Sequence, residues 1–246
     1  MLKVINLLIF MPNNLPCYLF CNGDAKSYMN HGGLPFNLFK EAKRQGVVDY
    51  AVSFDYKKLK YWKYFWNFKQ LIRYGKPGGF QYSKFYTRKI LSQFTTDENS
   101  EIKILSIYPL LPSYPWPDKW QIYFYIDYTS SQIFNEYKQS NLISDSYKKN
   151  ILKRERLNYL NAKNIICRSK AAEISLIKDY KINKEKISIV PGGANLNLSR
   201  IKRDKLFKIP LEPKKDKPII LGFIGLDWNR KGGRFLIKLA AKKGSG

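Results

Sequence analysis

The chain has 246 residues, of which 44% are hydrophobic, so it can build one large domain or one and a half ordinary ones. Its formal net charge of +25 is spread along the whole sequence and suits nucleic acid, an anionic membrane face or a phosphorylated substrate, with a solvated lysine-rich surface as the alternative. No nucleic-acid-binding motif is present, so we expect no nucleic-acid partner. Three cysteines are too few for a disulfide framework, and no apolar run is long enough to span a membrane, which together predict a cytoplasmic protein.

Short apolar runs alternate with helical patterns through the first two hundred residues. Strands are predicted near residues 4–10, 47–54, 102–108, 121–126, 164–167 and 187–190. Helical patterns are predicted from His31 to Gly46, over 80–94, over roughly 131–162, and over 169–180 with Ser169 as the N-cap. A polar loop with Asn13, Asn14, Asn22, Gly23 and Asp24 is expected after the first strand. This alternation predicts an α/β fold with a Rossmann-like, doubly wound parallel sheet.

Residues 56–74 interrupt the alternation with a stretch dense in Lys, Trp, Tyr and Phe. Lysines fall all round a helix built on this stretch, which disfavours a core helix. Three interpretations stay open: a peripheral contact with an anionic membrane, a surface that binds an acceptor, and a plain surface helix.

Three glycine-containing loops have the chemistry to bind phosphate at the carboxyl ends of strands. Gly32 and Gly33 precede a helix, and a second loop, 191–195, follows the strand at 187–190. The third loop, 225–233, follows an apolar run that begins at Pro218 and precedes another helical pattern. Basic side chains and glycines in this third loop can neutralise and admit a diphosphate: Gly225, Arg230, Lys231 and Gly232.

In this order the three loops resemble the family 4 retaining glycosyltransferases of the GT-B fold. In that family a Gly-Gly loop follows the first strand and a proline–glycine turn closes the N-terminal domain. The second domain then opens with a strand, a glycine, and a lysine–glycine pair six and seven positions further on, a spacing that Gly225, Lys231 and Gly232 keep. The arginine that usually follows the first of these glycines is replaced by Leu226, and Arg230 is the alternative source of a guanidinium.

The resemblance implies transfer of a hexosyl unit from a nucleotide-diphosphate sugar to a glycan or lipid-linked acceptor, with no metal and no cofactor. It implies an acceptor-side domain over 1–200, a linker over 201–217, and the first βα unit of a donor-binding domain over 218–246. It assigns Gly32, Gly33 and the third loop to the donor diphosphate. The single histidine, His31, does not lie at the strand end where the family often has one facing the sugar. Asp127 follows the strand at 121–126 and is the candidate to orient an acceptor hydroxyl, with a purely structural strand-end role as the alternative.

A complete donor-binding domain needs well over about a hundred residues, and the sequence predicts an unfinished one. We therefore expect weak or absent transfer by this chain alone. The alternative function is a non-catalytic Rossmann-like module that binds an acceptor or a membrane.

Overall fold

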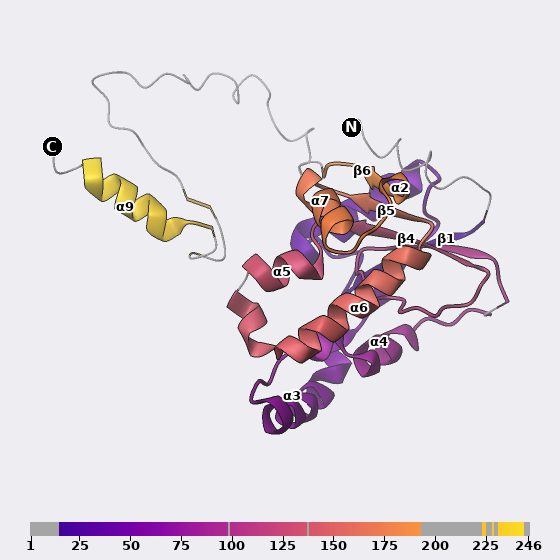
Figure 1. The fold of residues 1–246 in the computed structure, drawn as a ribbon. Helices are drawn as coiled ribbons and strands as arrows, with labels where there is room; N and C mark the ends of the chain where they lie inside the picture. Colours follow the sequence, from indigo (N-terminus) through magenta and orange to yellow (C-terminus); the bar gives the residue numbers. More distant parts are fainter. Residues whose placement is uncertain are drawn as a thin grey trace, which may run out of the picture. The chain divides into compact units, whose positions relative to one another are not determined.

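The structure is a computed structural model that describes residues 15–97, 99–136, 138–192, 223–224, 228 and 231–243 (Figure 1). The chain divides into two units, Met1–Leu196 and Asn197–Gly246. The expected strand at 4–10 and the expected linker at 201–217 lie outside the described residues.

The first unit is built on a parallel sheet of six strands. The strands are β1 (Cys17–Asn22), β2 (Tyr50–Phe54), β3 (Ile102–Ser106), β4 (Trp120–Ile126), β5 (Asn164–Cys167) and β6 (Ile187–Ile189). Their order across the sheet is β2-β1-β3-β4-β5-β6, and every neighbouring pair is parallel. The predicted α/β class and doubly wound parallel sheet are therefore confirmed. The strand order reverses between β1 and β3, and this reversal is the place where ligands bind in open α/β sheets.

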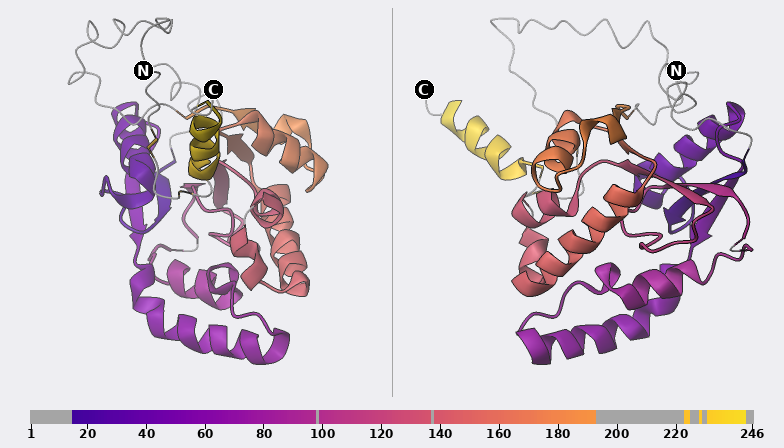
Figure 2. Two further views of the ribbon diagram at one scale, coloured as in Figure 1. Left: turned by 90° about the vertical axis from the view of Figure 1, so that its left-hand side faces the viewer. Right: turned by 45° about the vertical axis from the view of Figure 1, so that its right-hand side comes forward.

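Helices connect the strands and cover both faces of the sheet (Figures 1 and 2). The helices of this unit are α2 (Leu34–Arg44), α3 (Lys60–Tyr74), α4 (Lys84–Leu91), α5 (Ser130–Glu136), α6 (Asp145–Asn161) and α7 (Lys170–Lys178). Short 3-10 turns are η1 (Asn30–Gly33), η2 (Tyr56–Leu59), η3 (Phe80–Tyr82), η4 (Lys138–Leu142) and η5 (Lys184–Lys186).

The core consists of two apolar layers, one on each face of the sheet, because successive side chains of a strand point to opposite faces. On one face Leu19 and Leu105 share a buried cluster with Leu38 and Ala42 of α2. On the other face the buried cluster joins the sheet to α4, α6 and α7. It includes Phe20, Ile104, Phe124, Ile165, Ile90, Tyr159 and Leu176.

The segment expected to be a polar loop is in part a strand, so that prediction is wrong. Residues 17–22 form β1, and Cys17, Leu19, Phe20 and Cys21 in it are buried. A strand covered on both faces needs no polar–apolar alternation, and the run of apolar residues at 4–10 is the stronger sequence signal. The strand nearest the reversal was therefore missed.

Several boundaries also differ from the predicted ones. The long helix expected over 131–162 is two helices, because the Ser144 side chain accepts a hydrogen bond from the Tyr147 amide and starts α6 afresh. The strand expected at 102–108 ends at Ser106, whose hydroxyl bonds the backbone of Tyr108 and turns the chain. Ser169 is the N-cap of α7, as predicted, and accepts from the Ala172 amide.

In the second unit the described residues form a turn that leads into helix α9 (Gly233–Lys243). The ring of Phe223 lies 4.7 Å from that of Trp228, and the Gly233 amide donates to the Trp228 carbonyl at 2.9 Å. A Cβ on Gly233 would lie 2.3 Å from the Trp228 ring, so only glycine fits this turn. Phe223 and Ile224, which lie in the apolar run expected to be a strand, have no strand assignment, and the rest of that run lies outside the described residues.

Candidate functional site at the carboxyl edge of the sheet

The residues that follow each strand meet along one edge of the first unit, here called the carboxyl edge. Beside the strand-order reversal this edge carries the turn that joins β1 to α2. In that turn His31, Gly32 and Gly33 have φ values of 46°, 64° and 76°, which are left-handed conformations that favour glycine. The predicted glycine pair thus lies directly before a helix at the strand-order reversal.

Side chains tie this turn to the end of β1. Asn30 Nδ2 and His31 Nε2 each lie 3.2 Å from the Asn22 carbonyl oxygen, and Asn30 Nδ2 also donates to the Asp24 carbonyl at 3.0 Å. The hydroxyl of Tyr86 donates to Asn22 Oδ1 at 3.0 Å and so ties α4 to the same point. The partners of Asn22 and Asn30 are set by the fold, so no local sequence pattern predicts their roles.

The two glycines have different surroundings. A Cβ on Gly33 would lie 3.1 Å from the Tyr28 ring, whereas a Cβ on Gly32 would meet no atom within 4 Å. Gly32 is exposed, and the amino end of α2 carries partial positive charge that favours an anion. A bulky anion can therefore approach the Gly32 backbone from solvent.

A cavity of about 450 Å³ adjoins this turn at the carboxyl ends of β1 and β2. Its lining includes Gly23, Asn30, Ser53, Asp55 and Lys57. A larger cavity of about 560 Å³ lies at the opposite edge, beside Trp116 and Lys119 before β4, and holds none of the predicted site residues. We place the candidate site at the carboxyl edge because the strand-order reversal and the glycine turn coincide there.

Asp127 lies directly after β4, where the sequence places it, and it is paired. Its Oδ2 is 3.2 Å from Nη1 of Arg168, the residue that follows β5. A Cβ on Gly192 would lie 2.4 Å from Arg168 Nη2, so the proline–glycine turn after β6 leaves room for this guanidinium. The Asp127 side chain is 52% exposed, so the pair stays open to solvent. Sequence reasoning missed Arg168, because the pair joins neighbouring strands that are far apart in the chain.

A buried carboxyl group supports the edge just beyond Asp127. Glu155 of α6 is fully buried and accepts from the Ser130 amide, at 3.1 Å to Oε1 and 3.2 Å to Oε2, where α5 begins. The hydroxyls of Tyr159 and Tyr180 donate to the same carboxyl group at 2.7 and 2.5 Å. Burial raises the pKa of Glu155, and these donors oppose that rise. The i, i+4 spacing of Glu155 and Tyr159 was the one sequence signal for this network.

Helix α6 also fixes the loop that leaves β3. Asn158 bonds the backbone of residues 109–114, and Arg154 donates to the Tyr82 carbonyl and to Ser113 Oγ. The Arg154 and Asn158 side chains form hydrogen bonds with backbone or hydroxyl groups of η3 and of the loop after β3. Strand β3 is one of the two strands at the strand-order reversal. The loop beside the candidate site is therefore held by a rigid helix.

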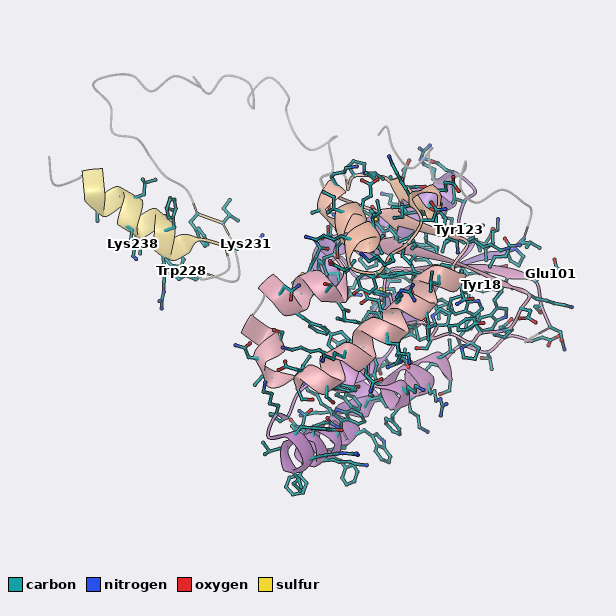
Figure 3. All side chains as sticks on the ribbon, in the orientation of Figure 1. Tyr18, Glu101, Tyr123, Trp228, Lys231 and Lys238 are labelled. Atoms are coloured by element: carbon teal, nitrogen blue, oxygen red, sulfur yellow. The ribbon has the colours of Figure 1, made fainter. Side chains whose placement is uncertain are left out.

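The third predicted loop belongs to the second unit. Lys231 is exposed there, and Gly232 has φ +83° with open space at its Cβ position, just before α9 (Figure 3). Gly225 and Arg230 lie outside the described residues. The structure brings Gly32 and Gly33 together with the end of β1, and it places Asp127 after β4, two strands further along the edge. The ends of β1 and β4 are about 10 Å apart by strand spacing.

Within the described part of the chain, no cluster of three or more His, Cys, Asp or Glu side chains could hold a metal ion. The three cysteines are buried and free. No helix among the described residues is long and apolar enough to cross a membrane. Comparison with protein-family models, curated proteins and solved structures finds no match to this chain.

Proposed function

We propose that this protein takes part in glycosyl transfer from a nucleotide-diphosphate sugar to a glycan or lipid-linked acceptor, on the cytoplasmic side of the cell. One observation carries the proposal. The left-handed Gly32–Gly33 turn leads into α2 where the strand order reverses, and a diphosphate is the ligand that such a turn suits best.

In this reaction the protein would contribute electrostatic stabilisation of the leaving group. When the sugar leaves, negative charge grows on the departing diphosphate, and oriented amide dipoles and basic side chains stabilise that charge. Gly32 and Gly33 supply close backbone approach at the amino end of α2. Within the second unit we assign diphosphate binding to Lys231 and Gly232, which are described, and to Gly225 and Arg230.

A second candidate function is a non-catalytic module that binds an acceptor or a membrane. The Asp127–Arg168 pair favours it, because a carboxylate engaged by a guanidinium has a structural role already. In this alternative the carboxyl edge binds a ligand without transferring it.

Binding distinguishes a diphosphate site from a simple turn. We would titrate the full chain with uridine, guanosine and adenosine diphosphate sugars by calorimetry, and compare Gly32→Ala with Gly46→Ala. Both glycines have left-handed φ values, 64° and 68°, and open space at the Cβ position. Each substitution therefore has the same backbone cost, about 1 kcal/mol. Gly46 lies at the other end of α2, just past its last turn.

We expect one of these nucleotide sugars to bind, and Gly32→Ala to weaken that binding about tenfold or more while Gly46→Ala leaves it unchanged. Turnover of the bound donor with an acceptor would then separate transfer from the non-catalytic alternative. Equal effects of the two substitutions, or no binding of any donor, would overturn the proposal.

A further inference from the structure

Helix α3 carries an apolar stripe that points into solvent. The stripe consists of residues spaced as one face of a helix: Tyr61, Tyr64, Phe65, Phe68, Leu71 and Ile72. Their exposed fractions run from 48% at Leu71 to 83% at Tyr61. Such a stripe normally faces the core, so its exposure calls for a partner.

The opposite face of α3 is already fixed to the body of the first unit. The Trp66 ring packs between Phe80 and Tyr147, with ring centroids 6.3 and 5.8 Å away, and the Trp62 ring lies 4.9 Å from that of Phe85. Gln70 is the only residue of the helix that is buried. These contacts set the rotation of α3, so the stripe cannot turn inward.

The return loop after α3 is equally constrained. The Gly78 amide donates to the Leu142 carbonyl at 2.7 Å, and a Cβ on Gly78 would lie 2.5 Å from that oxygen. In both views of Figure 2, α3 lies on the outside of the first unit, beyond α4. Side chains extend outward from its ribbon in Figure 3. The stripe is therefore a fixed, protruding surface.

The charge around the stripe has one sign. Residues 56–96 contain no Asp or Glu. Exposed cations lie on α3 and on the turn before it: Lys57, Lys58, Lys60, Lys63, Lys69 and Arg73. A second copy of this chain would bring two such basic surfaces together, which opposes self-association through α3. An anionic surface has the complementary charge.

We propose that α3 docks the protein onto an anionic lipid bilayer. The helix has 15 residues and is about 22 Å long, too short to cross the roughly 30 Å hydrocarbon core, so it lies in the plane of the interface. Its aromatic and aliphatic side chains enter the headgroup region, where Tyr and Trp are favoured. The flanking lysines contact anionic headgroups, each contributing modestly to affinity. This surface adjoins the carboxyl edge at Lys57, which also lines the cavity there, but the proposal does not depend on the proposed transfer.

Vesicle flotation of the full chain tests the proposal. We expect binding to phosphatidylcholine vesicles with about 30% phosphatidylglycerol, at least about tenfold weaker binding to pure phosphatidylcholine, and weakening by salt. Phe65→Ser with Phe68→Ser should lower the partition coefficient about tenfold or more. The matched control is Ile174→Ser with Ile177→Ser, two exposed apolar residues of α7 with the same spacing, and it should leave partition unchanged.

Hydrogen exchange supplies a second measurement, in which anionic vesicles should slow exchange of the α3 amides and leave α7 unaffected. Equal binding to both vesicle types, or equal loss in the α3 and α7 variants, would overturn the proposal. So would a salt-sensitive complex with polyglutamate and none with vesicles, which would identify an acidic protein surface as the partner. A concentration-dependent dimer that Phe65→Ser with Phe68→Ser abolishes would assign the stripe to self-association instead.

Discussion

Asn158 joins α6 to the loop that leaves β3, and its removal tests how that loop is held. Its Nδ2 donates to the carbonyl oxygens of Pro109 and Pro112 at 2.7 and 2.9 Å, and its Oδ1 accepts from the Tyr114 amide at 2.8 Å. The residue is 1% exposed. Asn158→Ala therefore leaves three backbone groups without their side-chain partner.

The cost follows from how much water each group can recover. A buried polar group left unsatisfied costs about 1–3 kcal/mol. Pro112 is buried, so the loss of a partner for its carbonyl accounts for most of this cost. Pro109 is only partly covered and Tyr114 is exposed, so the Pro109 carbonyl and the Tyr114 amide can bind water instead. We expect Asn158→Ala to lower the free energy of unfolding by about 2–4 kcal/mol, a large part of a typical total of about 5–15 kcal/mol.

Urea denaturation of the full chain measures this loss, with Asn161→Ala as the matched control on the same helix. Asn161 is exposed, and its Nδ2 donates to the Leu157 carbonyl of its own helix, so its removal should cost less than about 0.5 kcal/mol. If the two variants unfold within about 0.5 kcal/mol of each other, the loop does not depend on Asn158 and the reasoning is refuted.

Three further predictions concern the stability of the fold and the reactivity of its thiols. Because burial raises the pKa of Glu155 above its ordinary value, the folded state keeps that proton to higher pH than the unfolded state does. The protonated Glu155 side chain therefore stabilises the folded state fully at pH values below the ordinary carboxyl pKa, and this stabilisation declines as pH rises toward the folded pKa. Glu155→Gln should remove this decline, as measured by urea titrations at a series of acidic pH values. Gly78→Ala should cost about 2–3 kcal/mol in urea denaturation, because its Cβ meets the Leu142 backbone. Gly192→Ala should cost under about 1 kcal/mol, because the Arg168 guanidinium can move away, and equal costs would contradict this difference. Burial raises the pKa of each cysteine thiol to about 12, so native protein at pH 8 should resist a thiol reagent that labels all three sites in urea.

Local chemistry made part of the fold predictable. Ser169 caps α7 through its own hydroxyl, and Gly32 with Gly33 precedes a helix, because both features depend on a few neighbouring residues. The strands at 164–167 and 187–190 were found to within one residue from their apolar runs and the turn residues beside them. β1 was missed because a strand buried on both faces shows no alternation, and the apolar run before it was the stronger signal.

The sequence by itself determined the α/β class, the position of the glycine turn before α2 and the excess of positive charge, since each depends on composition or short-range pattern. It also showed that a helix over 56–74 would be aromatic and basic, but not which way its apolar residues point. Only the tertiary structure decided that the α3 stripe faces solvent, that Asp127 pairs with Arg168, and that Glu155 accepts a hydrogen bond from the Tyr180 hydroxyl. These outcomes depend on contacts between elements distant in the chain, and the strand order that brings those elements together is set by packing of the whole sheet, which no local pattern encodes.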